Sequence, residues 1–338
     1  MKKNKFISTA YTAIINTINS AISVILGLIF SKLLLLNYGS EMNGFISSIT
    51  QFVSFFTILE GGFTTAAIVS IYQPLLNKKY DEVNDILYTA KVKYLRIGTI
   101  ISILVLLLGS IYLLFIEIQL PYLHSFILII ICLLQTFLSI SIESKYNILF
   151  SGDNKEYIIT FLKLIARLIG WIISIVFIIL KFNIILVYST YLITSILNIV
   201  LIRKKEQKDY TFVKYNGKNV PEKIKGTNDL MLQKIANTVF NSTDIILISI
   251  IINFAMASVY SVYNLIYRSI TQITRSFVAS PFNSLGQLLN SSDKNHKKII
   301  EISTIYDQFC VTVVTIILTI TAICTIPFIK LYIAGVVD

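Results

Sequence analysis

Residues 96–116 read RIGTIISILVLLLGSIYLLFI, and this stretch decides the fold class. Its only charged residue is Arg96, which stands at the edge. A helix of roughly 20 apolar residues is long enough to cross the hydrocarbon core of a bilayer. Lipid offers no hydrogen-bond partners to the backbone, so a segment of this kind must be helical. The stretch therefore predicts a transmembrane helix.

The same pattern recurs along most of the chain, which is 55% hydrophobic and only 14% charged. A mean hydropathy of +0.75 is far above that of an ordinary soluble domain. We predict an all-α polytopic membrane protein with about nine transmembrane helices. The other predicted spans are 11–36, 42–73, 122–142, 157–181, 183–202, 231–253, 255–281 and 303–328.

Positive charge is distributed unevenly between the connections. Most of the 29 lysines and arginines lie at the N-terminus and in alternate connections, whereas the other set of connections holds only Lys181 and Lys330. Basic residues favour the cytoplasmic side, so we expect a cytoplasmic N-terminus. The net charge of +11 is then a topology signal and a means of contacting anionic lipid, and we expect no nucleic acid partner.

The spans divide into two groups with a weak internal repeat. Residues 44–77 resemble residues 259–290 at an offset of about 215, and both copies end in Leu-Leu-Asn before a basic connection. Parallel repeats of this kind are a transporter architecture. We predict a six-helix lobe at 1–205, a cytoplasmic linker at 206–230 and a partial second lobe of three helices at 231–338. Chance similarity of two helices is the alternative.

Two further expectations follow from this division. Six spans against three lead us to expect a fragment that lacks about three helices of its second lobe. Residues 78–95 begin with two lysines and, as a helix, would place Val83, Ile86, Leu87 and Ala90 along one side. This pattern predicts an amphipathic helix on the inner membrane face.

Nothing in the sequence indicates an enzyme, a metal or a cofactor. There is no phosphate-binding GxxxxGK[ST] loop, no HExxH and no GxSxG motif. Cys132, Cys310 and Cys324 lie in apolar segments at unrelated spacings, which is typical of small core residues. We therefore expect any function to reside within the membrane-spanning part.

Charged residues inside spans are costly and are candidate functional residues. Arg268 and Arg275 are seven apart and share one helix face. Asp244 lies at the depth of Arg268 in the neighbouring span, so these two could pair. Glu60 is offset by 215 from Arg275, which suggests a contact between the two lobes. A purely structural Asp244–Arg268 pair, and an Arg275 that reaches the inner interface, are the alternatives.

Lys163 and Arg167 occupy positions i and i+4 of one span. Arg167 lies about 15 Å from the inner end, too deep to reach the headgroups easily, so we expect it in a cavity. Lys163 could instead extend to the inner headgroups. Glu60 precedes Gly61 and Gly62, which either pack closely against another helix or form a hinge.

The first span carries a polar stripe. A stripe of this kind faces protein or water rather than lipid, either to line a sugar-compatible path or to bond between helices. Its members are Asn16, Thr17, Asn19, Ser20 and Ser23.

Two stretches resemble the polysaccharide transporters of the multidrug/oligosaccharidyl-lipid/polysaccharide flippase superfamily. Residues 38–75 (YGSEMNGFISSITQFVSFFTILEGGFTTAAIVSIYQPL) are similar to the family's outer turn, glycine-centred helix and tyrosine-proline exit. Residues 242–263 (STDIILISIIINFAMASVYSVY) resemble its seventh span. The amphipathic connection after the second span also fits. The resemblance extends over nearly the whole chain, although the chain is shorter than the family's twelve to fourteen helices.

The resemblance implies a two-lobed, MATE-like bundle in a bacterial plasma membrane. It implies flipping of undecaprenyl-pyrophosphate-linked oligosaccharides for capsule or O-antigen-type polymers, with polysaccharide polymerase machinery as a further partner. It also implies cationic cavity residues, for which Arg167, Arg268 and Arg275 match by position, while Asp244 matches the seventh-span aspartate. The alternatives are a cation-coupled multidrug or metabolite exporter of the same fold and an inactive truncated remnant.

Overall fold

A computed structural model describes residues 2–60, 62–116, 120–218, 220–221, 224, 227–289 and 296–332. Helices make up 90% of it, and the described residues include no strand. Each predicted span lies largely in helices, and six helices of the described residues are long and apolar enough to cross a membrane. The chain is an all-α membrane protein.

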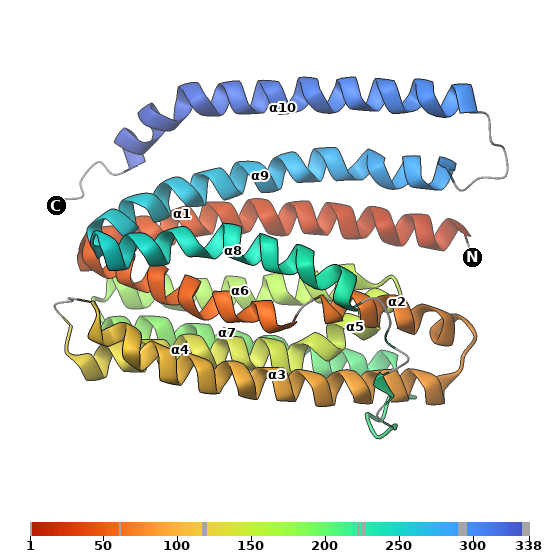
Figure 1. The fold of residues 1–338 in the computed structure, drawn as a ribbon, viewed down its shortest axis with the longest axis horizontal. Helices are drawn as coiled ribbons and strands as arrows, with labels where there is room; N and C mark the ends of the chain where they lie inside the picture. Colours follow the sequence, from red (N-terminus) through yellow and green to blue (C-terminus); the bar gives the residue numbers. More distant parts are fainter. Residues whose placement is uncertain are drawn as a thin grey trace.

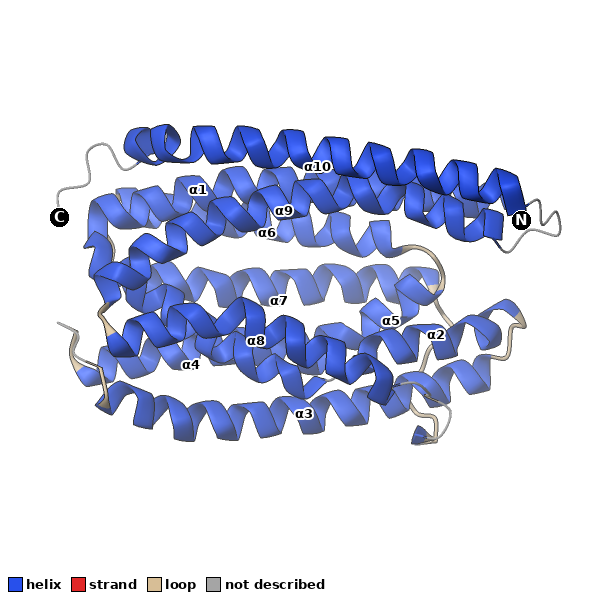
Figure 2. Ribbon diagram, turned by 45° about the horizontal axis from the view of Figure 1, so that its top comes forward, coloured by secondary structure: helices blue, strands red, loops and turns tan. Residues whose placement is uncertain are grey.

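The long helices run roughly parallel and antiparallel to one another in a single bundle (Figures 1 and 2). In chain order they are α1 Lys2–Phe55, η1 Phe56–Glu60, α2 Phe63–Leu76, α3 Tyr80–Leu114, α4 Tyr122–Leu138, η2 Ser139–Glu143, α5 Ser144–Gly152, α6 Glu156–Ile179, α7 Ile184–Asp209, α8 Thr227–Ile251, α9 Phe254–Leu289 and α10 His296–Tyr332.

Helix α1 holds the first predicted span and the first part of the second, up to Phe55. At Gly39 the backbone leaves the helical region, with φ of 80° and ψ of 170°, and the chain turns back on itself (Figure 1). Glycine suits this position because a positive φ is strained for a residue with a Cβ. The second predicted span is itself interrupted, since a 3₁₀ turn, η1, separates the end of α1 from α2.

The prediction of a separate amphipathic helix on the membrane surface was wrong. Residues 80–95 are the first part of α3, which runs unbroken for 35 residues and, at 1.5 Å per residue, is about 52 Å long. Its apolar side is buried within the protein, with Val83, Leu87 and Ala90 fully inaccessible. Protein rather than lipid covers this face, and α3 projects beyond the predicted inner side of the membrane.

The predicted linker is partly ordered structure. Residues 206–209 belong to α7, and residues 210–218, which we call the strap, lie against the projecting end of α3. Asn84 donates through Nδ2 to the carbonyl of Phe212 at 3.0 Å and accepts at Oδ1 from the amide of Lys214 at 2.8 Å. Asp85 accepts from the amide of Lys218 at 2.7 Å. Side chains of α3 therefore bind the strap's backbone.

Helices α8 and α9 pack on α1, and α10 lies along α9 (Figure 1). Gly44 of α1 lies close against the start of α9, where a Cβ atom would stand 1.8 Å from the carbonyl oxygen of Phe254. Beside it, Asn43 donates to the hydroxyl of Ser258 at 2.8 Å, and these two residues are 215 apart in the sequence.

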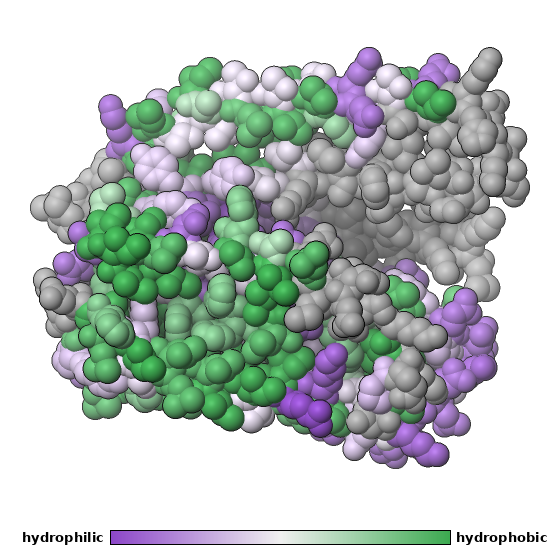
Figure 3. Space-filling model, viewed as in Figure 1, coloured by the Kyte–Doolittle hydropathy of each residue, from purple (hydrophilic) through white to green (hydrophobic). Residues whose placement is uncertain are grey.

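Apolar side chains cover much of the visible outer surface of the bundle (Figure 3). Many large aliphatic residues are exposed, among them Ile103, Leu107, Ile172 and Ile179. A soluble protein rarely exposes so continuous an apolar surface. Hydrophilic residues gather at the end where α2 meets α3, which matches the charge asymmetry of the sequence.

Candidate functional site

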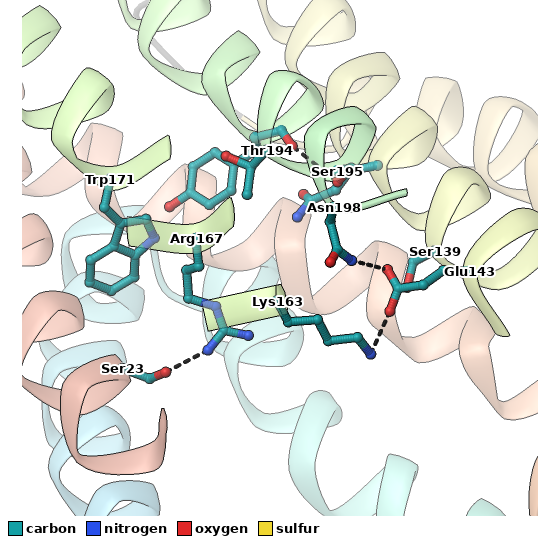
Figure 4. Close-up of a pocket in the computed structure, with 11 residues that line it drawn as sticks. Ser23, Ser139, Glu143, Lys163, Arg167, Trp171, Thr194, Ser195 and Asn198 are labelled. Atoms are coloured by element: carbon teal, nitrogen blue, oxygen red, sulfur yellow. Dashed lines mark hydrogen bonds and ion pairs between the residues drawn. The ribbon is translucent and has the colours of Figure 1, made fainter. Parts of the chain in front are cut away.

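A cavity of about 360 Å³ opens between α1, the α4–η2 segment, α6 and α7. Its lining is unusually polar for the interior of an apolar bundle. The lining residues are Ser23, Gln135, Ser139, Glu143, Lys163, Arg167, Trp171, Tyr191, Thr194, Ser195 and Asn198. Figure 4 shows the lysine and the arginine side by side on α6, facing different partners.

The carboxylate of Glu143 is the acidic centre of the cavity. Its Oε1 lies 2.5 Å from Nζ of Lys163, and its Oε2 accepts from Nδ2 of Asn198 at 2.8 Å (Figure 4). The Glu143 side chain is 10% exposed and that of Lys163 is 29% exposed. Lys163 also donates to Oδ1 of Asn147 at 3.3 Å. The structure thus places Lys163 in a buried ion pair rather than extended toward headgroups.

Glu143 ends the π-helical segment η2, Ser139–Glu143, between α4 and α5. A π-helical turn widens the helix by one residue and shifts the side chains after it to a new face. Such turns occur frequently at functional sites. Both ends of η2, Ser139 and Glu143, line the cavity.

Arg167 is the second cation, and it does not pair with a carboxylate in the described part of the chain. Its Nη1 donates to Oγ of Ser23 at 2.5 Å and to Oδ1 of Asn19 at 3.3 Å. Both partners belong to the polar stripe of the first span, so the prediction that this stripe faces protein or a cavity is confirmed for them. Since Lys163 is balanced by Glu143, Arg167 leaves the described lining with one positive charge.

The aromatic side chains of the lining suit a ring-bearing ligand. Trp171, the only tryptophan in the chain, and Tyr191 present aromatic rings beside Arg167. Oδ1 of Asn198 is buried and has no hydrogen-bond partner among the described residues. A buried acceptor without a donor is costly, and a ligand in the cavity would reach this oxygen only after rotation of the Asn198 side chain.

Asp244 and Arg268 lie outside this cavity and are not in direct contact. Asp244 accepts a short hydrogen bond from the hydroxyl of Tyr260, and Arg268 donates a short hydrogen bond to the carbonyl of Asn241. No Asp244–Arg268 ion pair occurs among the described residues, although the two charges are close enough to interact. In place of the predicted direct pair, Asp244 bonds a tyrosine and Arg268 bonds a backbone carbonyl, while their shared membrane depth stays a prediction.

Glu60 ends the 3₁₀ turn η1, away from the cavity. It accepts a short hydrogen bond from Thr64, whose hydroxyl also bonds that of Tyr94 at 2.6 Å. The Arg275 side chain lies outside the described residues, so the predicted Glu60–Arg275 contact stays a prediction. Of the six candidates, the structure brings together Lys163 and Arg167.

Two central residues were missed at the level of sequence. Glu143 directly follows the predicted span 122–142 and was counted with the connection, because the pattern did not reveal that the helix continues through Gly152. Asn198 is an ordinary polar residue inside a predicted span. A carboxylate directly after one apolar run and an amide inside another were the available signals.

The described residues contain no group of His, Cys, Asp and Glu that could hold a metal ion. No protein-family model matches the chain, and neither a curated protein nor a solved structure matches it. The features that bear on function are therefore the cavity and the two stretches of sequence at 38–75 and 242–263.

Proposed function

We propose that the chain is a transmembrane flippase for undecaprenyl-pyrophosphate-linked oligosaccharides, which supply surface polysaccharide synthesis in a bacterial plasma membrane. The observation that carries the proposal is Arg167, a cation within an apolar bundle that forms no ion pair with a carboxylate among the described residues. A membrane interior strongly penalises pyrophosphate charge, and a guanidinium offsets that penalty with forked donors and a proton it does not lose.

The rest of the lining supports a sugar next to the phosphate. The Trp171 and Tyr191 rings can stack on a pyranose face. A volume of about 360 Å³ is within the range of small-ligand sites. The cavity would hold the headgroup and its first sugar while the lipid tail stays in the bilayer.

The arrangement of the second lobe is part of the same proposal. Residues related by a two-fold axis touch their own counterparts only near that axis. Asn43 and Ser258 are separated by the repeat offset of 215 and are hydrogen-bonded. This contact supports a two-lobed, MATE-like architecture with its axis beside Gly44. We propose nine spans and a cytoplasmic N-terminus on the hydropathy and charge pattern of the sequence alone. Polysaccharide polymerase machinery is the partner that would consume the product.

The single tryptophan offers a direct binding assay, because Trp171 lines the cavity. Titration of the purified chain with an undecaprenyl-pyrophosphate-linked saccharide should shift Trp171 emission saturably. Loss of one charged hydrogen-bond partner removes about 1.5–3 kcal/mol, so Arg167→Gln should weaken binding about 10- to 150-fold. Transbilayer movement of a labelled substrate in proteoliposomes should fall in parallel.

Lys181→Gln, in a predicted outer connection, is the matched control and should bind like the wild-type chain. Equal affinity and transport for Arg167→Gln would remove the cavity from the proposal. Binding without transport would support a substrate site in a chain that needs a further component to complete the movement.

A cation-coupled exporter of drugs or metabolites is the second candidate, and Glu143 favours it. A buried carboxylate that shares a lysine can exchange that partner for a proton or another cation. In that case Glu143→Gln should abolish efflux that depends on a cation gradient, whereas Arg167→Gln should leave it nearly unchanged. The opposite ranking of the two variants supports the flippase.

A further inference from the structure

Three cations from different helices interact electrostatically at the predicted inner end of the bundle, and none of them lines the cavity. Lys145 of α5 is the centre of the group. Its Nζ lies 4.4 Å from the ring centroid of Tyr215 in the strap and 4.9 Å from that of Tyr146. Lys91 of α3 and Arg203 of α7 are near enough to act on it electrostatically.

This group carries an excess of positive charge. Neither Lys91, Lys145 nor Arg203 forms an ion pair in the described structure. The acid that acts on Lys145 is Glu206, which is 5% exposed and accepts a short hydrogen bond from the hydroxyl of Tyr215. Three cations and one carboxylate leave two uncompensated charges. Because like charges repel, a bound anion would stabilise this arrangement.

The depth of the cations matches the headgroup layer of the inner leaflet. The uncharged run 97–114 of α3 is about 27 Å long and the run 184–202 of α7 about 28 Å, each close to the thickness of the hydrocarbon core. Arg203 therefore stands at the inner boundary, and Lys91 lies about 9 Å beyond it along α3. A headgroup phosphate occupies the zone between these two levels.

We propose that Lys91, Lys145 and Arg203 bind the phosphate of an anionic phospholipid in the inner leaflet. The guanidinium of Arg203 offers paired donors to the phosphate oxygens, while the two ammonium groups supply charge. The ring of Tyr215 places the strap against the site, so an occupied site holds the strap to α3, α5 and α7. This site is separate from the cavity and does not depend on the proposed function.

The test uses the full purified chain in detergent micelles that contain phosphatidylglycerol or, as the reference, phosphatidylcholine. Helix unfolding is followed by circular dichroism, and retained lipid is counted by native mass spectrometry. We expect phosphatidylglycerol to raise the melting temperature and to remain bound through gentle ionisation. Each basic residue near an anionic headgroup contributes to the affinity for the lipid, and the loss of one should weaken lipid binding about 5-fold.

Lys145→Gln and Arg203→Gln are the test variants, and Arg203 is the exposed member whose loss is least expected to disturb folding. Lys204→Gln, the exposed neighbour on α7, is the matched control. The proposal is supported if both test variants lose most of the stabilisation by phosphatidylglycerol and the control keeps it.

Two outcomes would overturn it. Stabilisation of the test variants equal to that of Lys204→Gln would assign the lipid effect to general surface charge. A rise in melting temperature with inorganic phosphate as large as that with phosphatidylglycerol would assign the site to a free anion instead of a lipid.

Discussion

The ion pair between Lys163 and Glu143 allows a quantitative test of the cavity. Replacement of Lys163 by Met removes the ammonium 2.5 Å from the carboxylate and leaves Glu143, whose side chain is 10% exposed, without its cation. Breaking a buried pair on one side typically costs 3–5 kcal/mol. Since Lys163 is 29% exposed to the cavity and Asn198 still donates to Glu143, we expect about 3 kcal/mol for Lys163→Met.

The reverse change is milder. In Glu143→Gln the flexible lysine can turn toward the cavity and recover solvent, so we expect about 1–2 kcal/mol. The double variant has no buried charge left in the pair. Its loss in free energy of unfolding should therefore be about 1–3 kcal/mol smaller than the sum of the losses in the two single variants. Unfolding by sodium dodecyl sulfate in mixed micelles, followed by circular dichroism, measures all four chains.

The matched control is Lys205→Met, which breaks the Lys205–Asp209 pair at the helix surface. Lys205 is 36% exposed, so solvent screening should keep its effect within about 0.5 kcal/mol. If the Lys163 and Glu143 changes simply add, or if Lys163→Met costs no more than Lys205→Met, the pair is not the buried, coupled unit described here.

Three further changes test the architecture. Gly44→Ala would place a methyl group 1.8 Å from the carbonyl of Phe254, so we expect at least about 2–3 kcal/mol of destabilisation in the same unfolding assay. A neutral result would contradict the close contact of α1 and α9. Asn84→Ala removes the hydrogen bonds to Phe212 and Lys214, which stabilise the attachment of the strap to α3 by about 1–2 kcal/mol. Trypsin cleavage within the strap should therefore become about 5- to 30-fold faster, whereas an unchanged rate would show that other contacts hold the strap. Reporter fusions after Lys79 and after Lys181 should report opposite sides of the membrane, and the same side for both would refute the predicted orientation.

The fold class could be predicted from the sequence because the apolar runs are long and their backbone has no alternative to a helix. Helix ends were harder. One apolar run begins near 96, yet the helix that contains it, α3, already begins at Tyr80. Another apolar run stops near 142, yet the helix continues as α5. These polar parts are helical because they pack against protein outside the bilayer, where Val83 and Leu87 are buried. Hydropathy reports what faces lipid, and it is silent where a helix leaves the membrane and packs against its own chain.

The candidate site, too, could be predicted only in part from the sequence. Arg167 could be predicted because charge is rare at that depth, and its partners could be guessed from the polar stripe of the first span. The role of Glu143 depends on the π-helical turn before it, which changes the face on which the carboxylate emerges. Nothing in a hydropathy profile marks such a turn, so the pairing of Glu143 with α6 and α7 required the three-dimensional structure.

The strap determines how far the two halves of the chain can separate. Thr89 accepts from the amide of Val220 at 2.8 Å, so the chain is anchored to α3 as far as that residue. Helix α8 begins at Thr227, seven residues later. A fully extended chain of that length reaches about 25 Å, whereas a free connection from Tyr210 to Thr227 would reach about 60 Å. Any rearrangement that moves the start of α8 must stay within this short tether, or it must first release the strap from α3.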